Sequence, residues 1–130
     1  MRIKELKGLK SVRVYQLYQQ VLIALGIYPT TQAKDLKTFI NEFDEKNIDE
    51  KREMLRAAVM LFNFDREDLK SILDFAISEP QGIEVSQIAD GMSPDKIADA
   101  VTYVLLKASE VKVFFWIPTV QKKSKTSQSV

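Results

Sequence analysis

The sequence contains no cysteine and no histidine. Without cysteine there can be no disulfide framework, no thiolate nucleophile and no cysteine-ligated zinc site. Without histidine the commonest general base and the commonest metal ligand are missing, and a Ser-His-Asp triad cannot be built. These absences exclude the most familiar kinds of nucleophilic and zinc-dependent catalysis. We therefore expect a non-enzymatic protein with no catalytic residue, no metal site and no cofactor.

Glycine and long apolar runs are also scarce. The four glycines stand alone along the chain, so neither a phosphate-binding loop nor a dinucleotide fingerprint can be formed. No apolar run approaches the roughly 18 residues that span a bilayer. No apolar segment of signal-peptide length follows the basic start Met1–Lys10. We expect a cytoplasmic protein without membrane contact, in the host cytoplasm if the protein is viral.

The composition is that of one globular domain. The chain has 130 residues, of which 45% are hydrophobic and 28% are charged, enough to bury a core. The formal net charge of +1 provides no overall attraction to nucleic acid. We therefore expect no specific nucleic-acid partner from composition alone.

Apolar residues recur at helical spacing through most of the chain. The spacing predicts helices at Ser11–Leu25, at Thr31–Lys46, from Asn47 or Asp49 to about Phe62, and at Arg66–Ile77. Asn47 followed by Glu50 has the form of a capping box, and Asp65 is placed to cap the fourth helix. The link between the third and fourth helices is short, so they should pack antiparallel or at a corner.

A longer helix is predicted from Ser93 to about Phe115, with Ser93 as its cap and Pro94 at its first position. One narrow face carries aliphatic residues, and a second apolar group falls on the opposite side. A helix with two apolar faces needs two partners, its own core and something else. We expect self-association and partner binding through the second face, which comprises Tyr103, Leu106, Val113, Phe114, Trp116 and Ile117.

Three segments leave alternatives open. Met1–Lys10 fits a short helix-like lead-in or a basic arm, and Ser78–Gly91 fits a short strand or one helical turn at Ile83–Ala89. Val111–Ile117 is rich in residues that favour strands as well as helices. The polar, Lys-rich residues 119–130 are expected to form a flexible tail. The fold prediction is an all-α compact domain over residues 1–118, with about five to six helices and room for one short strand pair.

A DNA-binding helix-turn-helix is the alternative function. The segment from Ile72 to Leu105 resembles the start of a winged-helix domain, with a helix, a turn, then Ile88-Ala89, a break, and a helix opening at Ser93. The second helix begins with Asp95 and Asp99 and offers only Lys96 to phosphates, which weighs against DNA binding.

The overall plan resembles the tail assembly chaperones of long-tailed bacteriophages. The resemblance rests on a small, largely helical, histidine-free chain that opens with LKGLKSVRVYQLYQQVLIALGI and closes with a Lys-rich tail. It implies a non-enzymatic protein that self-associates and keeps the long tape-measure protein soluble while the tail assembles. No catalytic residue follows from it.

Overall fold

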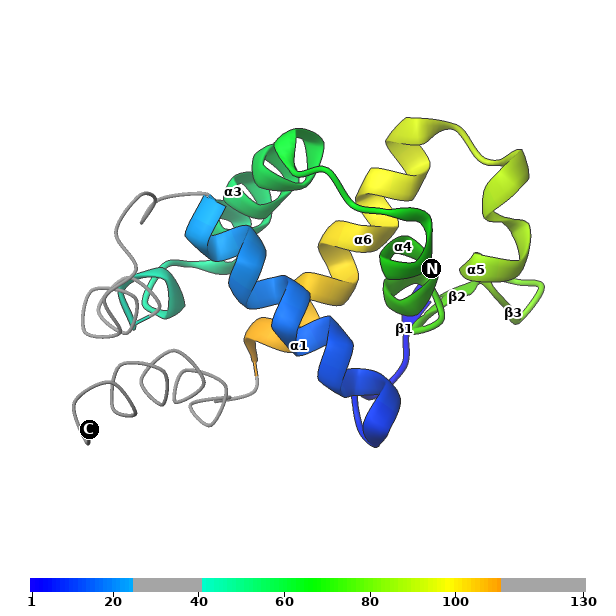
Figure 1. Cartoon of the computed structure of the whole chain (residues 1–130), viewed down its shortest axis with the longest axis horizontal. Coiled ribbons are helices and arrows are strands. Elements are labelled where there is room, and N and C mark those ends of the chain that lie inside the picture. Colours follow the sequence, from blue (N-terminus) through cyan, green and yellow to red (C-terminus); the bar gives the residue numbers. More distant parts are fainter. Residues whose placement is uncertain (25–40, 111–130) are drawn as a thin grey trace, which may run out of the picture.

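The computed structural model describes residues 1–24 and 41–110 (Figure 1). The described elements, in chain order, are β1 (Arg2–Ile3), α1 (Leu9–Leu22), α3 (Ile48–Leu61), α4 (Arg66–Leu73), β2 (Ala76–Ser78), β3 (Ile83–Glu84), α5 (Val85–Ile88), the 3-10 turn η2 (Ala89–Gly91) and α6 (Pro94–Ser109). The fold is mostly helical, as predicted. Its small antiparallel sheet has three strands, in the order β1-β2-β3, instead of the single strand pair for which the prediction left room.

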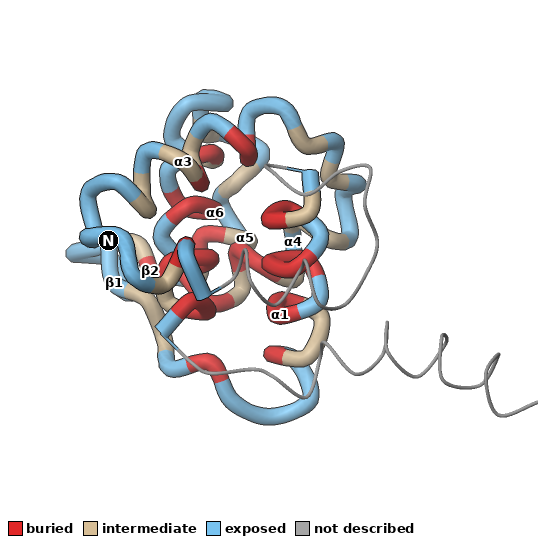
Figure 2. Tube along the Cα trace, turned by 90° about the vertical axis from the view of Figure 1, so that its left-hand side faces the viewer, coloured by how far each residue is buried: buried red, intermediate tan, exposed pale blue. Residues whose placement is uncertain are grey.

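The core surrounds α6, which packs against α1, α3 and α4. Buried positions gather on the inward sides of these helices, and exposed positions lie on the periphery (Figure 2). Because these three helices surround α6, it is buried over most of its circumference. Its buried residues are Ala98, Ala100, Val101, Thr102, Val104, Leu105, Leu106, Ala108 and Ser109.

Side-chain caps begin three of the helices at the predicted positions. Asn47 Oδ1 accepts a hydrogen bond from the Glu50 amide at 2.9 Å, so Asn47 and not Asp49 caps α3. The Asp65 carboxylate accepts from the Asp68 amide at 2.7 Å and caps α4. The Ser93 hydroxyl oxygen accepts from the Lys96 amide at 3.4 Å and caps α6. Each cap satisfies an amide that the first helical turn would otherwise leave unpaired.

The fourth helix is shorter than predicted. It ends at Leu73, and Ala76–Ser78 form β2, so the predicted continuation to Ile77 is wrong. β2 is the central strand, in which Ile77 is paired with Arg2 on one side and with Glu84 on the other. Ala76 is fully buried. Pairing with two strands from distant parts of the chain overrides the local helical spacing.

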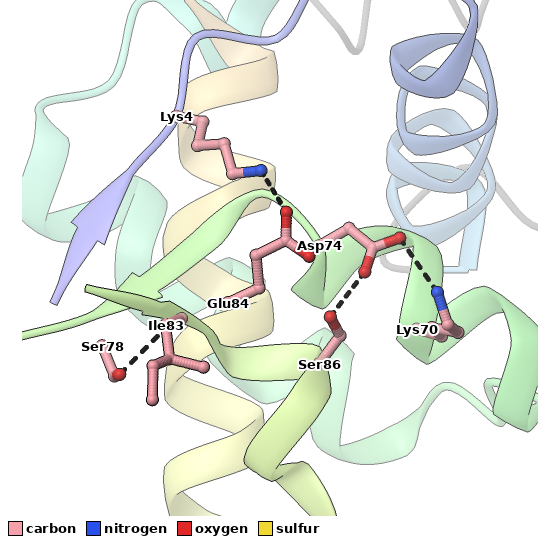
Figure 3. A network of polar contacts seen from close by, with 7 residues as sticks. All are labelled: Lys4, Lys70, Asp74, Ser78, Ile83, Glu84 and Ser86. Atoms are coloured by element: carbon pink, nitrogen blue, oxygen red, sulfur yellow. Dashed lines mark hydrogen bonds and ion pairs between the residues drawn. The ribbon is translucent and has the colours of Figure 1, made fainter. Parts of the chain in front are cut away.

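The basic start of the chain is an edge strand, so the predicted helix-like lead-in is wrong. The Lys4 amide donates to the Phe75 carbonyl at 2.8 Å. Arg2 Nε pairs with Glu79 at 3.0 Å, and Lys4 Nζ pairs with Glu84 on the neighbouring hairpin (Figure 3). These two cations are therefore engaged within the domain, which also speaks against a free basic arm.

The segment after β2 contains both structures that its pattern allowed. Ile83–Glu84 form β3, and Val85–Ile88 follow directly as the single turn α5. The Ser86 hydroxyl donates to Asp74, and Lys70 lies 3.4 Å from the same carboxylate (Figure 3). Asp74 thus fastens α5 to the end of α4.

Several predictions lie wholly or partly outside the described residues. Of the predicted helix Thr31–Lys46, only residues 41–46 are described, and residues 41–44 are helical. Of the long helix predicted to about Phe115, α6 accounts for Pro94–Ser109, and the Glu110 amide donates to the Lys107 carbonyl at 3.2 Å. The structure of Val111–Ile117, the boundary at Pro118 and the tail are not described. Among the described residues, none of the helices combines the length and apolar character needed to cross a bilayer.

Candidate functional site

Of the six residues predicted to form an exposed face on the long helix, the structure describes Tyr103 and Leu106. Tyr103 is exposed, with an exposed fraction of 42%, whereas Leu106 is buried in the core at 6%. Val113, Phe114, Trp116 and Ile117 lie outside the described residues. The expectation that Leu106 is exposed is therefore wrong.

The burial of Leu106 follows from the position of α6 in the fold. The sequence pattern assigns one narrow face of this helix to the core, but three helices pack around it. A helix with partners on several sides buries apolar residues over most of its circumference. The second apolar face of α6 is covered by the domain itself as far as Leu106, and Tyr103 is the exception.

Tyr103 lies beside a groove between α3 and α6, here called the α3–α6 groove. The two helices run in opposite directions, so the end of α3 lies near the start of α6 (Figure 1). The groove has a volume of about 410 Å³. Its lining residues are Arg52, Glu53, Arg56, Ala57, Met60, Asp99, Thr102 and Tyr103. Met60 and Tyr103 contribute its largest exposed apolar surfaces.

An ion-pair cluster joins the two sides of this groove. Arg56 Nε donates to Asp99 Oδ1 at 2.8 Å, and Arg56 Nη2 lies 3.6 Å from Asp95 Oδ1. The hydrogen bond to Asp99 raises the pKa of Arg56, and the charge of Asp95 adds to the increase. Both carboxylates at the start of α6 are thus engaged by one guanidinium, which positions α3 against α6.

The structure also exposes apolar residues at the end of α3 that the sequence analysis did not single out. Met60 and Leu61 have exposed fractions of 56% and 88%. Next to them the rings of Phe62 and Phe64 are half-buried, with centroids 4.7 Å apart. We call Met60, Leu61, Phe62 and Phe64 the apolar ridge.

A signal for the ridge was present in the sequence. From Ala57 to Phe64 the chain reads AAVMLFNF and carries no charge. Leu55, Ala58 and Val59 are the residues of this helix that enter the core, which leaves Met60 and Leu61 pointing elsewhere. Apolar residues that exceed what one helix face can bury indicate a second contact.

A second hollow, here called the Ile97 cleft, lies on one side of the ridge. Its volume is about 310 Å³, and it opens between the end of α3, α4 and the start of α6. Its lining residues are Val59, Met60, Phe62, Asn63, Phe64, Leu69, Pro94, Ile97, Ala98 and Val101, and none of them is charged. The cleft is therefore suited to an apolar side chain.

The helix-turn-helix alternative meets a structural difficulty. The helix before the turn, α5, is a single turn from Val85 to Ile88. The would-be recognition helix is α6, which is largely buried and whose exposed first residues include Asp95 and Asp99. A recognition helix must place an exposed face in the major groove, so this arrangement weighs against DNA binding.

Within residues 1–24 and 41–110, no three acidic side chains gather closely enough to hold a metal ion. Two neighbouring hollows and the apolar ridge lie between α3 and its neighbours on the described surface. Comparison with known protein families, with curated proteins and with solved structures found no match to this chain.

Proposed function

We propose that this chain is a non-enzymatic assembly factor that binds an apolar helical segment of a protein partner in the α3–α6 groove. The observation that carries the proposal is the pairing of exposed Met60 with exposed Tyr103 along a groove between two antiparallel helices. Grooves of this kind take the apolar face of an amphipathic helix.

The position of the charges supports a helix as the occupant. Arg56 and Asp99 are held to each other across the groove, so neither needs a counter-charge from a partner. Glu53 and Arg52 lie on the rim, where they can contact the polar side of a bound helix. The arrangement of apolar anchors within a charged rim is that of a protein interface.

The resemblance to phage tail assembly chaperones suggests which partner this is. The finer proposal is that the client is a tape-measure-like long helical protein, which the chain keeps soluble during assembly. Such a client offers a repeating apolar surface, so a shallow groove used many times suits it better than one deep pocket. The α3–α6 groove is shallow in this sense, with few apolar anchors.

Co-expression with a tape-measure protein that is insoluble on its own tests the proposal. We expect the wild-type chain to keep this client in the soluble fraction and Tyr103→Asp to lose that protection. Leu9→Asp is the matched control, because Leu9 is 91% exposed and does not line the groove. If the wild type leaves the client in the pellet, or Tyr103→Asp protects it equally well, the proposed function is wrong.

A further inference from the structure

We propose that the α3–α6 groove selects a helix that carries lysine or arginine beside its apolar stripe, and that Glu53 makes this selection. The inference rests on the proposed function, because it names the charge of the helix that the groove binds. The starting observation is that Glu53 lines the groove and is exposed. It forms no ion pair with any described residue, whereas both arginines of the groove do.

The two arginines of the groove are already engaged by other carboxylates. Arg52 Nη2 lies 3.0 Å from Asp49 Oδ1. Arg56 Nε lies 2.8 Å from Asp99 Oδ1 on the opposite helix. Each guanidinium therefore has its own counter-charge, and neither balances the charge of Glu53. The carboxylate of Glu53 is left as the charge that a bound partner can satisfy.

The groove and its rim carry an excess of negative charge. Among the described residues, the two guanidinium groups meet four carboxylates there, which belong to Asp49, Glu53, Asp95 and Asp99. Lys107, about one turn beyond Tyr103 on α6, is paired with Glu110 at 3.4 Å and does not offset this excess. The whole chain has a net charge of +1, so the negative charge is local to this surface. Such a surface attracts a positively charged partner and repels a negatively charged one.

The antiparallel packing of the two helices places Glu53 at the same end of the groove as Tyr103. Because Arg56 pairs with Asp99, the turn of α3 before Arg56 lies opposite the turn of α6 after Asp99 (Figure 1). Those two turns carry Glu53 and Tyr103, respectively. Met60, the other exposed apolar residue of the groove, lies about two turns from Glu53 along α3. The groove thus has an apolar anchor at each end and an unpaired carboxylate at one of them.

These positions define the kind of helix that fits. An amphipathic helix can set apolar residues against Met60 and Tyr103, while a lysine or arginine one turn away on the same helix reaches Glu53. A glutamate or aspartate in that place would face a like charge that has no counter-charge of its own. Repulsion of this kind is a common source of specificity. The groove therefore prefers basic amphipathic helices to acidic ones.

The exposure of Glu53 limits the size of this preference. Ion pairs at a solvent-exposed position contribute little, and dissolved salt screens them. We expect the loss of the Glu53 charge to weaken binding of a basic helix roughly two- to fivefold. The apolar anchors hold the helix, and Glu53 determines which helix binds more tightly.

Two fluorescent helical peptides with the same leucine stripe, one flanked by lysines and the other by glutamates, test the selection. Fluorescence anisotropy with the full chain should show tighter binding of the lysine peptide, and added salt should reduce the difference. Glu53→Gln should weaken the lysine peptide roughly two- to fivefold, and Glu53→Lys should shift the ratio of the two affinities roughly tenfold toward the glutamate peptide. Glu67→Lys is the matched control, because Glu67 is also exposed but lies on α4 outside the groove. It should leave the ratio as in the wild type.

Tyr103→Ala locates the bound peptides, because it removes an apolar anchor of the groove without changing its charge. It should weaken both peptides by the same factor, and unchanged binding would place them outside the groove and refute the inference. If both peptides bind the wild type equally well, or Glu53→Lys leaves their ratio unchanged, the charge selection is wrong while the groove remains a helix-binding site. If neither peptide binds, the proposed function is wrong and the charge selection is wrong with it.

Discussion

Arg13 and Asp68 join α1 to α4 through two parallel hydrogen bonds. Arg13 Nε donates to Asp68 Oδ1 at 2.9 Å, and Arg13 Nη2 donates to Asp68 Oδ2 at 3.0 Å. This bidentate contact raises the pKa of Arg13. It links residues that lie far apart in the sequence, and it leaves Asp68 in the first turn of α4, where a negative charge is favourable.

We predict that Arg13→Met lowers the free energy of unfolding by about 1 kcal/mol. Charged hydrogen bonds are worth more than this when buried, but the Arg13 side chain is 42% exposed and solvent weakens the pair. Arg13→Lys should lose less, because it retains the charge without the bidentate geometry. Urea unfolding measures both variants. Lys7→Met is the control, because Lys7 and its partner Glu5 are both highly exposed. If Lys7→Met lowered the free energy of unfolding as much as Arg13→Met does, the interpretation of the Arg13–Asp68 pair would be contradicted.

Truncating Leu106 should destabilise the fold, whereas truncating Tyr103 should not. Leu106 is buried among the residues of the core, so Leu106→Ala should cost roughly 2–5 kcal/mol. Tyr103 is exposed, so Tyr103→Ala should change stability by less than about 0.5 kcal/mol. Chemical unfolding of the two variants provides the measurement. If Leu106→Ala is as stable as the wild type, Leu106 is not part of the core, and the exposed apolar face that the sequence pattern suggested is supported instead.

Stability should fall as the pH rises above the range in which an exposed tyrosine ionises. Burial raises the pKa of Tyr18, and the nearby charge of Asp44 raises it further. In the unfolded chain this tyrosine loses its proton near pH 10, whereas in the folded chain it keeps the proton. Above about pH 10 the unfolded state therefore binds fewer protons than the folded state. The contribution of Tyr18 to stability is complete below about pH 10 and decreases above it.

Tyr18→Phe isolates this effect, because phenylalanine cannot ionise. Above about pH 10 the wild type should lose up to roughly 1.4 kcal/mol more per pH unit than the variant. Unfolding curves collected at several pH values for both proteins give the difference. Parallel pH profiles for the two proteins would show that Tyr18 ionises as readily in the folded chain as in the unfolded one.

The sequence by itself determined where three of the helices begin. Asn47, Asp65 and Ser93 each cap a helix because the accepting oxygen and the donating amide are only three residues apart. The mostly helical class and the starts of α3, α4 and α6 follow from such short-range bonds and from helical spacing. The uncharged stretch from Ala57 to Phe64 also held the signal for the apolar ridge, although not its shape.

Only the tertiary structure decided what depends on distant partners. Arg2 and Ile3 form a strand because Ala76 and Ile77 pair with them, and no local pattern contains that information. Leu106 is buried because three helices surround α6, which the spacing of one helix cannot reveal. The Ile97 cleft exists because α4 and the start of α6 meet the end of α3. Helical spacing records which residues share a face, whereas long-range packing determines which faces are covered.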